Sequence, residues 1–106
     1  MQEAARKNMA RQMALTQTNR NSLPELYSQE DEGTNAIGQV RYFWGSSASF
    51  VATEFDGEDT FFGYISGVQE SGWTYMSLSE MWSTHGRFMG TERDYHFTPT
   101  AIANLQ

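Results

Sequence analysis

Short apolar runs separated by polar turns dominate the middle of the chain. Runs at 39–44, 49–55, 60–67 and 72–77 are rich in Val, Ile, Phe, Tyr, Trp and Thr, and Gly, Ser or Asp-Gly signals lie between them. Each run predicts a strand, and the links are too short for the crossover that parallel strands need. A further strand is predicted at 92–97. The pattern therefore favours an antiparallel meander of four to five strands.

Helical signals lie on either side of these runs. Ser77-Leu78-Ser79-Glu80 has the spacing of a capping box and predicts a short helix that ends near His85-Gly86, with Leu78, Met81 and Trp82 inward. Thr98-Pro99 predicts the start of a last helix, because proline suits the first helical position. With an N-terminal helix, these elements define a small single α+β domain.

The first 20 residues differ from the rest in pattern and in charge. Met1, Ala5, Met9 and Met13 recur at a spacing of four, which predicts a helix over 2–18. This segment holds four basic residues and one acid, whereas 21–106 hold three arginines and twelve acids, so the two parts carry +3 and −9. We divide the chain into a basic helix or arm at 1–20 and an acidic α+β domain at 21–106. The methionine stripe formed by Met1, Met9 and Met13 has three interpretations: it packs on the domain, it docks into a groove of a partner, or it belongs to a frayed arm.

Composition narrows the class of protein. The chain of 106 residues contains no cysteine, which excludes disulfides, thiolate metal sites and a cysteine nucleophile. No apolar run reaches the ~20 residues that span a bilayer, and we expect a cytoplasmic protein without a cofactor. An acidic body repels phosphate backbones, so it disfavours direct nucleic-acid binding and favours a basic protein partner. The basic N-terminal segment alone could bind nucleic acid or an acidic surface.

A dense group of carboxylates, Glu54, Asp56, Glu58 and Asp59, is the first candidate binding site. Asp56-Gly57 between two apolar runs predicts a hairpin with a type I′ turn. The four carboxylates could instead hold a cation, although their spacing is not that of an EF-hand. A third interpretation is charge mimicry, in which carboxylates on the surface imitate phosphates for a DNA-binding partner.

The second candidate site is Glu92, Arg93, Asp94 and His96. On a strand, Glu92, Asp94 and His96 would share one face, where they could bind a metal or form an acid–histidine pair. Three such ligands span roughly 13 Å at ~3.3 Å per residue, too far to meet at one ion on a straight strand. The simpler interpretation is a polar sheet face, with Arg93 as an internal partner for a carboxylate.

The large aromatic side chains have two interpretations. We expect Trp44, Trp73, Trp82 and Tyr75 in the core, because a small domain has few large residues with which to fill its interior. An exposed Trp73 would instead indicate a stacking platform.

Several motifs together resemble a known family. They are Leu23-Pro24-Glu25-Leu26-Tyr27, Ala52-Thr53-Glu54-Phe55-Asp56-Gly57 with Asp59 and Phe61-Phe62-Gly63, Ser77-Leu78-Ser79-Glu80, and Glu92-Arg93-Asp94 with His96-Phe97 and Pro99. Over Leu23–Pro99 the chain resembles a family of small proteins of bacterial plasmids, integrated elements and phages, catalogued as a domain of unknown function. Such genes often lie among antirestriction and plasmid-transfer genes. The segment between the Ser77 helix and Glu92 departs from the family's pattern.

Three hypotheses for function follow. The first is a non-enzymatic accessory protein of a mobile element that binds another protein through an acidic surface, for example as an antirestriction or anti-defence inhibitor. The second is a small metal-dependent hydrolase or nuclease that uses Glu54, Asp56, Glu92, Asp94 and His96. The third is a structural or assembly component. The sequence contains no catalytic motif, which favours a protein that is not an enzyme.

Overall fold

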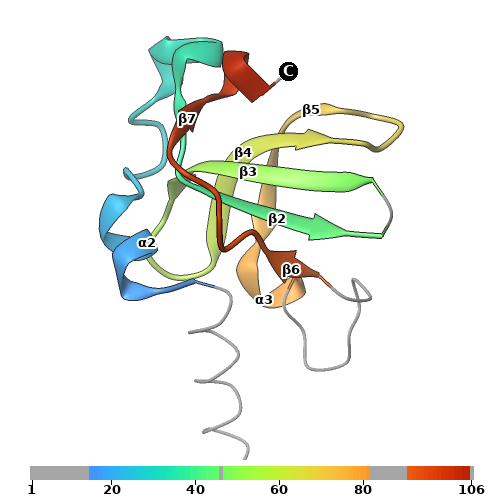
Figure 1. The fold of residues 1–106 in the computed structure, drawn as a ribbon. Coiled ribbons are helices and arrows are strands. Elements are labelled where there is room, and N and C mark those ends of the chain that lie inside the picture. Colours follow the sequence, from blue (N-terminus) through green and yellow to red (C-terminus); the bar gives the residue numbers. More distant parts are fainter. Residues whose placement is uncertain (1–14, 46, 82–90, 106) are drawn as a thin grey trace, which may run out of the picture.

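The centre of the molecule is a five-stranded antiparallel sheet in the order β5-β4-β3-β2-β6 (Figure 1). The computed structural model describes residues 15–45, 47–81 and 91–105. Four strands, β2 (Val40–Trp44), β3 (Ala48–Phe55), β4 (Thr60–Ser66) and β5 (Gly72–Ser77), follow one another as hairpins. The fifth, β6 (Glu92–Arg93), pairs with β2 on its other side. The predicted α+β class and meander are confirmed.

The core lies on one face of this sheet. Tyr42, Phe50 and Phe61 come from three neighbouring strands and have no exposed surface. The ring centroids of Phe61 and Phe55 are 4.6 Å apart. Apolar residues outside the sheet complete the cluster; they are Leu15, Leu23, Leu78 and Met81. Large apolar side chains on alternate strand positions therefore form the interior, as the period of two requires.

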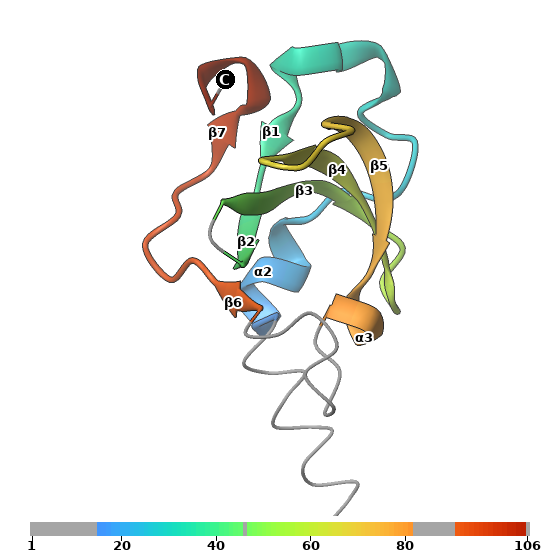
Figure 2. The same cartoon turned by 90° about the vertical axis from the view of Figure 1, so that its right-hand side faces the viewer.

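Two short helices belong to the core side of the sheet. Thr16 is the N-cap of α2 (Gln17–Ser22), and its hydroxyl accepts a hydrogen bond from the Asn19 N–H. Figure 2 shows α2 beneath the curved sheet. The helix α3 (Leu78–Met81) begins after Ser77, whose hydroxyl accepts the Glu80 N–H at 3.2 Å. Leu78 and Met81 are buried as predicted. Trp82 and most of the helix expected at 2–18 lie outside the described residues.

A second layer covers part of the other face, and the sequence did not predict it. It consists of the 3₁₀ helix η1 (Glu30–Asn35), β1 (Ile37–Gly38), β7 (Thr100–Ala101) and the 3₁₀ helix η2 (Ile102–Leu105). β1 and β7 lie side by side and pair antiparallel (Figure 2). Ile102, which follows β7, is buried. A Cβ on Gly38 would lie 2.2 Å from Val51 Cγ1, so only glycine lets β1 approach the sheet this closely.

Two predicted C-terminal elements are wrong. The strand expected over 92–97 ends at Arg93, because the Phe97 N–H donates to the Asp94 carbonyl and closes a turn. Thr98-Pro99 do not start a helix. The chain continues into β7, which pairs with β1, and the 3₁₀ helix begins at Ile102. Within residues 15–45, 47–81 and 91–105, no helix has the length and apolar content that crossing a membrane requires.

Candidate functional site

Glu54 is buried, with 3% of its surface exposed. One carboxylate oxygen accepts the Tyr27 N–H at 2.8 Å and the other accepts the Gln29 N–H at 2.9 Å. The Pro24 carbonyl accepts the Phe55 N–H at 2.9 Å. These bonds fasten the loop 24–29 to the end of β3. The structure thus places Glu54 inside the domain, where its carboxylate is an acceptor for the backbone and not part of an exposed acidic surface.

Asp56 organises the turn between β3 and β4. Its Oδ1 accepts the N–H groups of Glu58, Asp59 and Thr60 at 2.8, 2.9 and 3.0 Å. Hydrogen bonds from the backbone of Thr60 and Glu58 lower the pKa of Asp56 below its usual value. The predicted hairpin is confirmed. The type I′ turn is wrong, because Gly57 has a positive φ (91°) and Asp56 does not.

Asp59 joins this turn to the start of α3. Its Oδ1 accepts the Ser79 N–H at 2.8 Å, and its Oδ2 accepts the hydroxyl groups of Ser77 and Ser79. Glu58 is exposed at the tip of the turn. It lies beside an open hollow lined by Gln17, Arg20, Phe55, Gly57 and Glu58. Three of the four clustered acids therefore hold backbone or hydroxyl donors of the domain itself.

The second candidate segment is held by an ion pair. Asp94 Oδ2 accepts from Arg41 Nη2 at 2.6 Å and from Nε at 3.1 Å, and Oδ1 accepts the His96 N–H at 3.0 Å. Burial raises the pKa of Asp94, but the bonds from Arg41 and His96 outweigh it and lower the pKa overall. The Arg93 guanidinium lies 4.5 Å from the Tyr95 ring centroid. Asp94 thus fixes the turn after β6 to Arg41 of β2.

The predicted common face of Glu92, Asp94 and His96 does not form, because the strand ends before Asp94. Glu92 and His96 are exposed, and the His96 backbone belongs to the turn that Asp94 caps. Arg93 Nη1 donates to Asn19 Oδ1 at 3.5 Å, so it links β6 to α2. The segment is therefore a short edge strand followed by a turn.

The two candidate segments lie apart. β6 pairs with Tyr42 and Phe43, which oppose Phe50 and Ser49 of β3. Phe55 is five residues further along β3, roughly 16 Å at ~3.3 Å per residue. No group of three His, Asp or Glu side chains that could hold a metal ion occurs among the described residues. The described geometry thus does not assemble the site that the hydrolase hypothesis requires.

Two half-buried and two exposed aromatic side chains gather instead on the sheet face opposite the core. Phe62 and Tyr64 of β4 pair across the strands with Tyr75 and Trp73 of β5. The Phe62 and Trp73 rings are stacked at 5.4 Å with an interplanar angle of 7°. Tyr64 meets Trp73 edge-on at 5.5 Å, and Phe62 lies 4.9 Å from Tyr75. Trp73 is 37% exposed and Tyr75 51% exposed, so the prediction that they lie in the core is wrong.

Tyr27 extends this group, and we call Tyr27, Phe62, Tyr64, Trp73 and Tyr75 the aromatic face. Tyr27 is 62% exposed and has a positive φ of 71°, a conformation that a bulky residue rarely adopts. The bond from its N–H to buried Glu54 holds it there. A hydrogen bond with the Tyr27 side chain raises the pKa of Tyr75, and the charges of Glu54 and Glu30 act in the same direction. Glu54 thus positions one end of the aromatic face.

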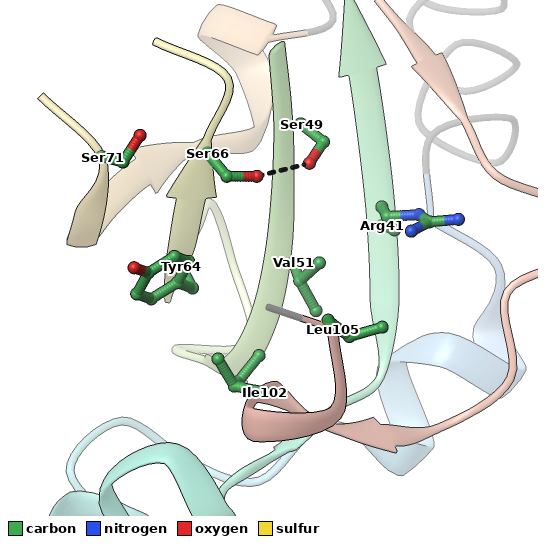
Figure 3. A pocket seen from close by; sticks show the side chains of 8 residues that line it. All are labelled: Arg41, Ser49, Val51, Tyr64, Ser66, Ser71, Ile102 and Leu105. Atoms are coloured by element: carbon green, nitrogen blue, oxygen red, sulfur yellow. Dashed lines mark hydrogen bonds between the residues drawn. The ribbon is translucent and has the colours of Figure 1, made fainter. Parts of the chain in front are cut away.

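A pocket of about 350 Å³ adjoins the aromatic face at Tyr64. It is lined by Arg41, Ser49, Val51, Tyr64, Ser66, Ser71, Ile102 and Leu105 (Figure 3). The Ser49 and Ser66 hydroxyl groups hydrogen-bond to each other at 3.0 Å across β3 and β4. η2 supplies Ile102 and Leu105. The pocket marks the place where the C-terminal layer stops covering the sheet and the aromatic face begins.

The sequence signal for the aromatic face was ambiguous. Along β5, Trp73 and Tyr75 alternate with Thr74 and Met76, so the period of two separates two sets without an obviously polar one. Both sets suit a strand, and only the packing of Met76 against the core tells which face is buried.

Comparison with known protein families, with curated proteins and with solved structures finds no match to this chain.

Proposed function

We propose that this protein is a non-enzymatic binding module whose aromatic face receives a basic segment of another protein. The observation that supports the proposal is the exposure of Trp73 and Tyr75 on a strand whose partners are regular and well packed. Trp and Tyr are the side chains most often responsible for binding energy at protein interfaces. On a rigid sheet they are already ordered, which lowers the entropic cost of association.

Charge supports a basic partner. The chain has a net charge of −6, and residues 21–106 hold twelve acids against three arginines. Single-stranded nucleic acids also stack on aromatic faces, but a carboxylate-rich surface repels their phosphates. Lysine and arginine side chains, in contrast, are attracted both by carboxylates and by the faces of aromatic rings. Glu30 and the buried Glu54 act on Tyr75 at one end of the aromatic face.

The biological setting of the proposal comes from the resemblance over Leu23–Pro99. It favours an accessory protein of a plasmid or phage that acts in the cytoplasm, with a nucleic-acid-handling defence protein as a basic target. In this proposal, Glu58 and the other clustered acids contribute to the long-range field that speeds encounter. The direct contact is made by the aromatic face.

The test is affinity capture from host-cell lysate at low and moderate salt. The wild-type chain is compared with the double variant Trp73→Ser/Tyr75→Ser and with Tyr95→Ser, a control that removes another exposed aromatic ring, 63% exposed, in the turn after β6. We expect a basic protein to be captured by wild type and by the control, more weakly at moderate salt, and not by the double variant. Retention by the double variant would contradict the proposal, and capture of nucleic acid alone would favour the stacking alternative.

A further inference from the structure

The outer edge of β5 is an open pairing surface. β5 ends the strand order, and no backbone hydrogen bond joins its outer side to any other segment that the structure describes. Its residues, Gly72–Ser77, include no charge and no proline, and they pair with β4 without a register shift. Proteins usually protect edge strands with lysine, proline or a bulge. β5 has none of these.

The hydrogen-bonding pattern shows which backbone groups point outward. The Asp56 N–H donates to the Thr60 carbonyl, so Thr60 directs its backbone groups toward β3. Because these directions alternate along a strand, Phe61, Gly63 and Ile65 face β5. Their partners Met76, Thr74 and Gly72 are therefore bonded to β4. The bond from the Leu78 N–H to the Asp59 carbonyl continues the same alternation.

It follows that Trp73 and Tyr75 direct their backbone N–H and C=O groups to the open edge. Their side chains are also the exposed rings of β5 on the aromatic face. In an antiparallel ladder, residues that exchange backbone bonds have their side chains on the same face, with Cα atoms about 5.5 Å apart. A residue paired with Trp73 or Tyr75 would thus lie directly beside that ring.

We propose that an extended segment of a basic protein binds by adding an antiparallel strand to β5. Its backbone pairs with Trp73 and Tyr75, and lysine or arginine at alternate positions lies against the aromatic face. Peptide addition to sheet edges is a general recognition mode in which backbone bonds give affinity and alternate side chains give specificity. Charge favours a basic occupant. Glu70 lies just before β5, and the negative charge of Glu30 acts on Tyr75, which lies near the other end of β5. This inference rests on the proposed function and specifies how the partner is held.

The probe is a short synthetic peptide in which lysine and valine alternate, added to the full chain. Amide hydrogen exchange is followed by NMR with and without the peptide. We expect the Trp73 and Tyr75 amides to exchange fast in the isolated protein and to become protected by about tenfold or more on binding. The Thr74 and Met76 amides, which are bonded to β4, are protected in both states and serve as the internal control.

Two methylated peptides form a matched pair. Methylation of the lysine amides removes the donors that would face β5, whereas methylation of the valine amides removes donors that face away. We expect the first peptide to lose about tenfold or more in affinity and the second to keep the affinity of the parent within about twofold.

The other outcomes overturn the inference. Equal affinity for both methylated peptides, or binding without protection of Trp73 and Tyr75, would mean that the aromatic face binds without strand addition, which leaves the proposed function intact. No binding of the parent peptide would also reject strand addition, while lysate capture with Trp73→Ser/Tyr75→Ser separately decides the proposed function. Protection that rises with protein concentration alone would identify a second copy as the occupant.

Discussion

At the scale of single residues, the carboxylates of this domain act mainly as acceptors for its own backbone. Glu54 accepts two N–H groups, and Asp56 accepts three. Asp59 accepts from α3, and Asp94 accepts from Arg41 and from the next turn. A charged acceptor forms stronger hydrogen bonds than a neutral one, so these carboxylates help to fix four short connections of the chain.

Replacing Glu54 with glutamine should destabilise the domain by about 1–3 kcal/mol, because the amide retains one acceptor and leaves a part-buried N–H of the 24–29 loop without a partner. Denaturant unfolding measures the loss. Glu32→Gln, at an exposed position of η1, is the control and should match wild type within about 0.5 kcal/mol. A Glu54→Gln variant as stable as the control would contradict the anchoring role.

Stability should fall in acid as Asp56 and Asp94 protonate. Their pKa values are lower in the folded protein than in the unfolded chain. Their contribution is therefore fully present above the unfolded pKa of ~3.9 and is lost as the pH falls through the lower folded values. We measure unfolding free energies of wild type and of Asp56→Asn from neutral pH down to strong acid. The side-chain oxygen of asparagine still accepts the N–H groups of the turn but does not titrate, so stability should decline less steeply with falling pH in the variant than in wild type. Parallel curves for the two proteins would contradict this.

At the scale of elements, the outer parts of this fold are short and depend on close approach. The strands β1, β6 and β7 have two residues each, which is too short for a recognisable alternation of apolar and polar residues in the sequence. Glycine permits two of the closest contacts. A Cβ at Gly63 would lie 2.1 Å from the Val51 carbonyl oxygen, whereas one at Gly38 would meet the Val51 side chain. The first obstacle is backbone and the second is a removable methyl group.

This difference predicts distinct couplings. Gly63→Ala and Gly38→Ala should each lower the free energy of unfolding by about 1–3 kcal/mol, because the added methyl group overpacks its surroundings. Val51→Ala should restore part of the stability that Gly38→Ala removes, because the new Cβ at position 38 clashes with the Val51 side chain. It should restore none of the stability that Gly63→Ala removes, because that clash is with the Val51 backbone. Double-mutant cycles of denaturant unfolding measure both couplings. Equal coupling in the two cycles would contradict the assignment of β1 to close contact with Val51.

At the scale of the whole molecule, the two faces of the sheet have separate tasks. Tyr42, Phe50 and Phe61 are fully buried on one face, and Trp73 and Tyr75 remain exposed on the other. The second face is partly covered by η2 and by the loop that Glu54 anchors. An acidic, partly aromatic surface on a rigid sheet is the feature on which the proposed binding function depends.

The separation of tasks predicts opposite effects of aromatic substitutions. Phe61→Ala should cost about 3–5 kcal/mol, because it opens a cavity among buried rings. Trp73→Ser should lower the free energy of unfolding by less, about 1–3 kcal/mol, because the ring is already 37% exposed and loses its stacking on Phe62 with part of its buried area, yet it should abolish capture of the partner. Thermal unfolding and lysate capture on the same preparations compare the two. A Trp73→Ser variant as unstable as Phe61→Ala would assign this ring to the core.

The sequence by itself determined the strands β2 to β5 of the meander, because turn residues and runs of strand-forming residues are local signals. It also determined the charge of the domain, which limits the kinds of partner. The tertiary structure decided the rest. Which side of β5 is buried depends on contacts of Met76 with distant residues, and the role of Glu54 depends on an N–H group 27 positions away. Such long-range choices leave no periodic trace in the sequence, which is why the burial of Glu54 and the exposure of Trp73 and Tyr75 became visible only in the tertiary structure.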